Sequence, residues 1–231
     1  MALEDDLKAR VKEIFRSNWT DRDGNVVPED AGVGLGNDAV KLDAVVLYAD
    51  LVESTDLVSN KTRKFAAEVY KTYLYCAARV IQADGGTITA YDGDRIMAVF
   101  VGGSKNTSAV RAALRIAYAV HNIVNPALAE QYPTAQYTVK QVVGIDSSDL
   151  YVARTGVRGA NDLVWVGPAA NYAAKLCGLR EDAFTTYITE KVHNNTADEM
   201  KTYNNQQIWE RRVWTKMNNM PIYRSSWWWK L

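Results

Sequence analysis

The chain has 231 residues, which is enough for one domain with a sizeable core or for two small domains. Its 27 Lys and Arg residues balance its 27 Asp and Glu residues, so no net basic charge marks it as a nucleic-acid or membrane-surface binder. No apolar run approaches the ~18 residues of a membrane span, and the acidic start lacks the pattern of a signal peptide. These features predict a cytoplasmic protein without nucleic-acid or membrane partners.

The first third of the chain predicts a helix, a linker, a buried strand and a second helix. Apolar residues at helical spacing indicate an amphipathic helix over residues 3–19, and the stretch 20–37, rich in Asp, Gly and Asn, indicates a loop or linker. The continuous apolar run 44–49 is typical of a strand buried on both faces, and Asp50 follows it directly. A long helical pattern then covers residues 63–83.

The rest of the chain alternates hairpins and helices. Strands 87–91 and 95–100 are joined through Asp92-Gly-Asp94, and a helix follows over 107–122. A second hairpin is expected from strands 139–145 and 150–155 around the polar run 146–149, then a strand at 163–166, a helix at 169–179 and short β-like runs. This order predicts an α+β fold with a mostly antiparallel sheet and helices on one face. We expect an N-terminal helix and linker over residues 1–41, and one larger domain with a Trp-rich β extension over 42–231.

Two carboxylates stand out by their positions in this pattern. Asp50 lies just past a buried strand, and Asp94 lies across a tight hairpin turn, so both meet at one sheet edge if the hairpin pairs beside the first strand. Converging acids repel each other unless a cation lies between them, and Mg²⁺ or Mn²⁺ takes such oxygen ligands. The backbone carbonyl of Leu51 could complete a second ion site. Each Asp taken alone is more typical of a turn or cap.

Four segments resemble the class III adenylate and guanylate cyclases, in the order that this family has. The segment 48–55 resembles the first metal-binding segment, and Gly93-Asp94 followed by 95–100 resembles the second. Val142-Val-Gly-Ile145 with 150–156 is similar to the family's Gly-Ile hairpin, and 166–176 is similar to its Gly-x-x-Val-Asn-x-Ala-x-Arg-Leu segment.

The resemblance implies a ferredoxin-like catalytic domain that works as a head-to-tail homodimer. Asp50 and Asp94, helped by the Leu51 carbonyl, would hold two divalent cations, Mn²⁺ or Mg²⁺. From the second protomer, Asn171 would orient the ribose and Lys175 would stabilise charge on the phosphates. The 3′-hydroxyl then attacks the α-phosphate and pyrophosphate leaves.

The chain departs from the purine cyclases where they read the base. Ala90 and Val164 stand where that family has polar base-reading residues, and a site that reads a base needs placed donors and acceptors. Lys175 replaces an Arg and so loses its bidentate fork. Tyr48 replaces the usual Phe, and its hydroxyl suits either base recognition or packing at the core rim.

The run 151–167, with Tyr48 and the segment Ala170-Asn-Tyr-Ala-Ala-Lys175, resembles the pyrimidine cyclases of bacterial Pycsar antiphage systems. This subgroup implies conversion of UTP to 3′,5′-cyclic UMP, with UTP ahead of CTP, and a separate effector that the product activates. Candidate substrate-binding residues are Tyr48, Arg95, Arg154 and Arg158, although a solvated basic loop is the alternative for at least one of the last two. Alternative functions are a cytidylate cyclase, an adenylate or guanylate cyclase, and a catalytically silent nucleotide-binding module.

Overall fold

We describe the fold from a computed structural model of residues 2–181 and 183–231. Its helices are α1 (Leu3–Arg16), α2 (Ser54–Asn60), α3 (Arg63–Ala83), α4 (Lys105–Ala119), α5 (Asn125–Gln131), α6 (Pro168–Leu176) and α7 (Glu190–Asn194). Its strands are β1 (Thr20–Asp23), β2 (Asp38–Leu51), β3 (Thr87–Asp92), β4 (Arg95–Phe100), β5 (Gln141–Val157), β6 (Ala160–Val166), β7 (Thr186–Thr189), β8 (Thr202–Tyr203), β9 (Gln206–Gln207), β10 (Glu210–Trp214) and β11 (Met220–Ser225).

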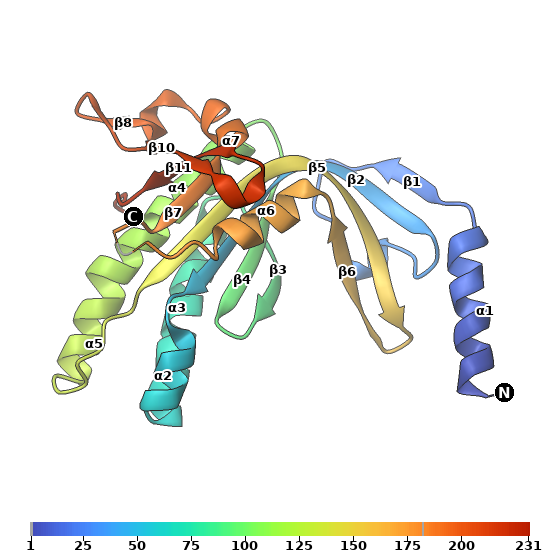
Figure 1. Cartoon of the computed structure of the whole chain (residues 1–231), viewed down its shortest axis with the longest axis horizontal. Coiled ribbons are helices and arrows are strands. Elements are labelled where there is room, and N and C mark those ends of the chain that lie inside the picture. The colour runs from blue at the N-terminus through green and yellow to red at the C-terminus, as the bar shows by residue number, and fades with distance from the viewer. Residues whose placement is uncertain (1, 182) are drawn as a thin grey trace.

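Within these residues, one sheet runs in the order β10-β11-β7-β5-β2-β4-β3, with β1 beside β2 and β6 beside β5 (Figure 1). The pairs β1–β2 and β5–β7 are parallel, and the other neighbours in this sheet are antiparallel. The short strands β8 and β9 form a separate pair. The α+β fold with a mostly antiparallel sheet is therefore confirmed.

The central strand β2 is buried on both faces, as its apolar run predicts. Val45, Leu47 and Ala49 face one hydrophobic cluster, and the alternate residues Ala44 and Val46 face a second cluster on the other side. This alternation follows from the two-residue repeat of a strand. The strand begins at Asp38, so the expected domain boundary between residues 41 and 42 falls inside β2.

The two long helices α3 and α4 cover one face of the sheet and contribute buried residues to the larger cluster. The helix expected over 63–83 has the bounds of α3, and the helix expected over 107–122 is α4 with the π-helical turn 120–124 that leads into α5. The expectation of helices on one face holds for α3 and α4. In contrast, α6 packs on the opposite face, where Ala169 and Ala173 join the second cluster.

The predicted second hairpin around residues 146–149 is wrong, because these residues lie inside the single strand β5. The strand pairs with β2 from Ala153 opposite Ala39 to Gln141 opposite Leu51 without a turn. Its polar side chains find partners far away in the sequence: the Thr189 hydroxyl donates to Asp146 Oδ1 at 2.6 Å, and the Ala169 amide donates to Ser148 Oγ at 3.0 Å. The hairpin of this region is β5–β6.

Helix α6 lies directly on β5 because Gly144 has no side chain. A Cβ atom at this position would lie 2.2 Å from the Ala173 carbonyl oxygen and 2.5 Å from the Cys177 amide nitrogen. The buried Cys177 thiol donates to the Val142 carbonyl at 3.2 Å and joins the helix end to the same strand. The backbone of α6 therefore packs directly against the backbone of β5.

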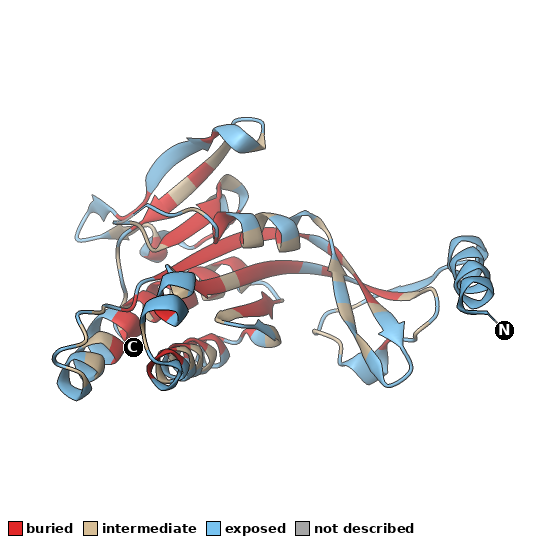
Figure 2. Ribbon diagram, turned by 60° about the horizontal axis from the view of Figure 1, so that its bottom comes forward, coloured by how far each residue is buried: buried red, intermediate tan, exposed pale blue. Residues whose placement is uncertain are grey.

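The β5–β6 hairpin and the first part of β2 extend from the body as an arm, and α1 stands beyond it (Figure 1). No residue of α1 is buried, and its apolar residues Leu3, Leu7, Val11, Ile14 and Phe15 are 44% to 85% exposed (Figure 2). An isolated helix of this length is marginal in water. Hydrogen bonds from Arg10 to the Leu35 carbonyl and from Asn37 to the Ile14 and Ser17 carbonyls attach it to the rest of the chain.

The Trp-rich C-terminus packs on its own domain. Trp227 and Trp229 lie against the larger cluster, and the Trp229 amide donates to the Leu114 carbonyl of α4 at 3.0 Å. No helix in the described part of the chain is long and apolar enough to cross a membrane.

Candidate active site

The two candidate metal ligands lie beside one cleft at the sheet edge. Asp50 is the next-to-last residue of β2, and Asp94 lies in the turn between β3 and β4. Because β4 pairs antiparallel with β2, with Ile96 opposite Ala49, this turn lies beside the end of β2. The cleft has a volume of about 480 Å³ and is lined by Asp50, Leu51, Glu53, Ser54, Thr55, Asp92, Gly93, Asp94, Arg95 and Arg180.

Asp50 is nearly enclosed, since its side chain is only 6% exposed. Two guanidinium groups point at one of its oxygens: Arg95 Nη2 lies 3.0 Å and Arg180 Nη2 lies 3.1 Å from Asp50 Oδ2. A buried carboxylate needs such partners, because desolvation disfavours the charged form. The single negative charge of Asp50 thus meets two positive charges.

Asp94 has the opposite environment. Its Oδ2 atom is buried and has no hydrogen-bond partner among the described residues. Burial raises the pKa of the Asp94 carboxyl, and the negative charge of Asp50 adds to the rise against a hydrogen bond from Ser54. Among the residues that the structure describes, no group of three or more His, Cys, Asp and Glu could hold a metal. Any cation here would therefore depend on this Asp pair and on backbone oxygen such as that of Leu51.

Of the candidate substrate-binding residues Tyr48 and Arg95, which lie beside each other, Arg95 lines the cleft and Tyr48 is outside its lining. The guanidinium carbon of Arg95 lies 5.9 Å from the ring centroid of Tyr48, within cation–π range. Burial raises the pKa of the Tyr48 hydroxyl, which therefore stays protonated and can donate a hydrogen bond. Ala90 lies on β3 next to a register shift, and Val164 lies on β6 and is 38% exposed. Neither side chain can form a hydrogen bond with a base.

Asn171 and Lys175 lie one helical turn apart on α6 and are exposed on the same side of that helix. Neither lines the cleft of its own chain. The Lys175 ammonium lies 3.9 Å from the sulfur atom of Met217. Within one chain, Asp50, Asp94 and Arg95 line the same cleft, and the two candidate catalytic residues of α6 lie outside it.

The two arginines of the β5–β6 hairpin also lie outside this cleft. Arg154 is bonded within the arm, with Nε 2.7 Å from Asn161 Oδ1 and Nη1 3.5 Å from the Val33 carbonyl. Arg158 is exposed in the hairpin turn.

Arg180 is the residue that sequence reasoning missed. It follows α6 in a loop, and a lone arginine after a helix end matches no motif. Only the folded chain shows that the loop returns to the end of β2, where Arg180 meets Asp50 across 130 positions of sequence.

The fold is that of the catalytic domains of class III nucleotide cyclases. The structure is similar to that of the guanylyl cyclase Cya2, with a TM-score of 0.69 and 17% sequence identity, over 82% of this chain and 94% of that chain. No family model matches the chain.

Relatives with higher sequence identity show which family of cyclases the chain belongs to. The chain is 51% identical to a uridylate cyclase of Xanthomonas perforans over the full length of both chains. It is 48% identical to a uridylate cyclase of Burkholderia cepacia over 99% of each chain. The chain belongs to the uridylate cyclase family.

Proposed function

We propose that this protein converts UTP to 3′,5′-cyclic UMP and pyrophosphate. The observation that carries the proposal is the meeting of Asp50 and Asp94 at one sheet edge, in a member of this family. Purine nucleotides are disfavoured because Ala90 and Val164 offer no hydrogen-bonding group to a purine, and a base-reading site needs such groups. Tyr48 and Arg95 are the polar side chains that we assign to the pyrimidine.

Asp50, Asp94 and the Leu51 carbonyl would hold two Mg²⁺ or Mn²⁺ ions, since these ions prefer oxygen ligands. The unpartnered Asp94 Oδ2 and the mutual repulsion of the two carboxylates fit this assignment. When bound, such ions polarise the attacking hydroxyl and neutralise charge on the phosphates.

The reaction is an in-line displacement at the α-phosphorus. The ribose 3′-oxygen forms a bond to the α-phosphorus and its proton passes to solvent, while the bond from the α-phosphorus to the α,β-bridging oxygen breaks and pyrophosphate leaves. Asn171 would hold the ribose so that the 3′-oxygen points at the phosphorus. Lys175 would stabilise the negative charge that develops on the phosphate oxygens.

We infer that Asn171 and Lys175 act on the cleft of a second protomer. Within one chain they lie outside the cleft that holds Asp50 and Asp94. The exposed apolar side of α1 and the exposed Val157 and Val166 of the arm also suit contact with another copy. A head-to-tail homodimer accounts for these observations together.

The deciding experiment is to incubate the purified protein with Mn²⁺ and each of ATP, GTP, CTP and UTP and to identify the products by mass. We expect cyclic UMP, and no product from the Asp50→Asn and Asp94→Asn variants. Cyclic CMP as the main product would reassign the substrate, and ATP as the preferred substrate would contradict the pyrimidine proposal.

We also propose that the product activates a separate effector in antiphage defence. If the concentration of cyclic UMP does not rise in infected host cells, this role is contradicted.

A further inference from the structure

Arg180 bridges the end of helix α6 and the end of strand β2. Its Nη1 donates to the Cys177 carbonyl at the end of α6, and its Nη2 lies 3.1 Å from Asp50 Oδ2 at the end of β2. The side chain is 37% exposed and lines the cleft of about 480 Å³. A guanidinium on a loop, partly in solvent and facing the cleft, has room to turn.

Two guanidinium groups share one oxygen of Asp50. Arg95 and Arg180 both donate to Oδ2 of this carboxylate, which is 6% exposed, while Glu53, Asp92 and Asp94 also line the cleft. A divalent cation that binds Asp50 adds more positive charge at this point, and like charges at short range disfavour one another. The cation therefore competes with the two guanidinium groups for this carboxylate.

Arg180 is the better candidate to leave. Arg95 belongs to strand β4 and lies against the Tyr48 ring, whereas Arg180 comes from the loop between α6 and β7. The planar fork of a guanidinium matches phosphate oxygens and forms strong charge-assisted hydrogen bonds with them.

We propose that Arg180 binds the triphosphate of the nucleotide, and that Asp50 holds it at the cleft until nucleotide and cation arrive together. This proposal rests on the proposed function, because it takes a nucleoside triphosphate as the ligand. In the nucleotide-free protein Arg180 competes with the cation for Asp50. In the complex Arg180 moves to phosphate oxygens, and Asp50 is then free for the cation.

The test uses binding rather than turnover. Mn²⁺ binding to the nucleotide-free protein is followed by electron paramagnetic resonance, and binding of 3′-deoxy-UTP, which lacks the attacking hydroxyl, is measured by calorimetry in Mn²⁺. Arg180→Ala should tighten Mn²⁺ binding roughly two- to fivefold, the size of a partly exposed ion pair. It should weaken 3′-deoxy-UTP binding about tenfold, the size of a hydrogen bond to a charged group. Arg180→Lys should recover only part of the nucleotide affinity.

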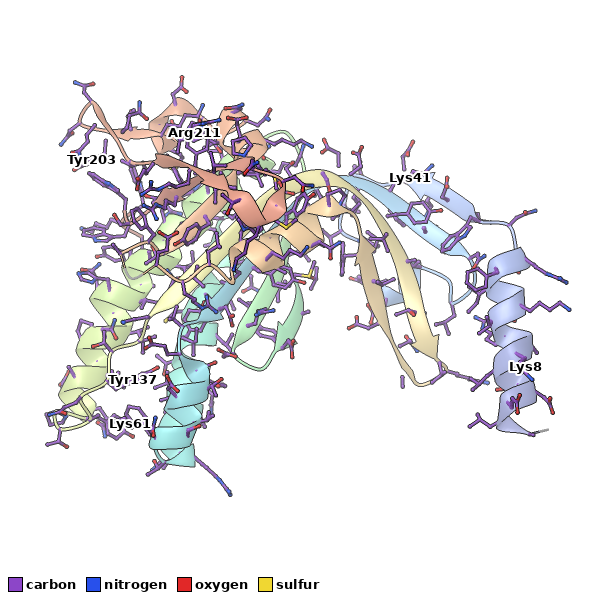
Figure 3. All side chains as sticks on the ribbon, viewed as in Figure 1. Lys8, Lys41, Lys61, Tyr137, Tyr203 and Arg211 are labelled. Atoms are coloured by element: carbon purple, nitrogen blue, oxygen red, sulfur yellow. The ribbon has the colours of Figure 1, made fainter. Side chains whose placement is uncertain are left out.

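The matched control is Arg211→Ala, because Arg211 pairs with Glu190 on the surface and lies outside the cleft; Figure 3 shows it at the top of the view, on the opposite side of the molecule from Lys61. It should change neither affinity. An Arg180→Ala protein that melts like wild type and keeps either affinity at the wild-type value would overturn the proposal. If Arg180→Ala does not fold, an Arg180→Lys protein with the nucleotide affinity of the wild type would also overturn the proposal. A wild-type protein that binds 3′-deoxy-UTP but forms no cyclic product contradicts the proposed function alone.

Discussion

At the scale of single residues, the cleft sets two carboxylates in unlike surroundings. Asp50 is compensated by two guanidinium groups, while Asp94 has a buried oxygen without a partner among the described residues and a raised pKa. A carboxyl whose pKa is higher in the folded than in the unfolded chain stabilises the fold below its ordinary pKa. This contribution is lost as the pH rises through the raised value. Above its raised pKa, the ionised Asp94 therefore weakens the metal-free fold.

Asp94→Asn should consequently stabilise the metal-free protein while it removes activity. In EDTA at pH 7.5 we expect the melting temperature to rise by roughly 1–2 °C, a modest effect because the group is partly exposed. Added Mn²⁺ should raise the melting temperature of the wild type but not of the variant. Scanning fluorimetry measures both effects, with Asp162→Asn on the exposed side of β6 as the control. A variant that melts below the wild type in EDTA would contradict this account.

At the scale of elements, the packing of α6 on β5 positions the two candidate catalytic residues of that helix. Gly144→Ala would push a methyl group into the Ala173 carbonyl, so α6 must shift and carry Asn171 and Lys175 with it. We expect a loss of about 1–3 kcal/mol in the free energy of unfolding, which is typical of overpacking. Urea denaturation measures it. Gly103→Ala, where an added Cβ meets nothing within 4 Å, is the matched control, and equal midpoints for the two variants would refute the argument.

Elements with a clean local pattern could be predicted from sequence, and others could not. The bounds of α3 follow from its helical repeat, and the strand after Gly93-Asp94 follows from its apolar run. The polar residues 146–149 look like a turn, but they lie inside β5, and Asp146, Ser147 and Ser148 are buried there. Thr189 and the backbone of Ala169 supply hydrogen bonds to Asp146 and Ser148. Hydrogen bonds between residues so distant in sequence cannot be predicted from a local pattern. The role of Arg180 could not be predicted for the same reason, whereas Asp50 and Asp94 lie at a strand end and in a turn, which a local pattern does predict.

At the scale of the whole molecule, the proposed site needs two copies of the chain. A mixture of Asp50→Asn and Asn171→Ala chains should recover about a quarter of the wild-type rate, because random pairing makes half of the dimers mixed and each mixed dimer keeps one intact site. The rate of cyclic UMP formation after mixing measures this. Asp50→Asn mixed with Asp94→Asn is the control without recovery, since both changes fall in the same cleft. Equal rates for the two mixtures would contradict a shared site.

The backbone contact between β5 and α6 also determines how such enzymes can be recombined. The atoms nearest to a Cβ at Gly144 are backbone atoms of residues 173 and 177, so the fit depends on a glycine at this position more than on the side chains of α6. A chimera that exchanges α6 for that of a relative, in order to transplant a different Asn171 and Lys175 environment, should fold as long as residue 144 stays glycine. Loops and the exposed hairpin turn carry no such restriction. Natural variation in nucleotide choice is therefore easier to introduce at the cleft rim than at the strand beneath it.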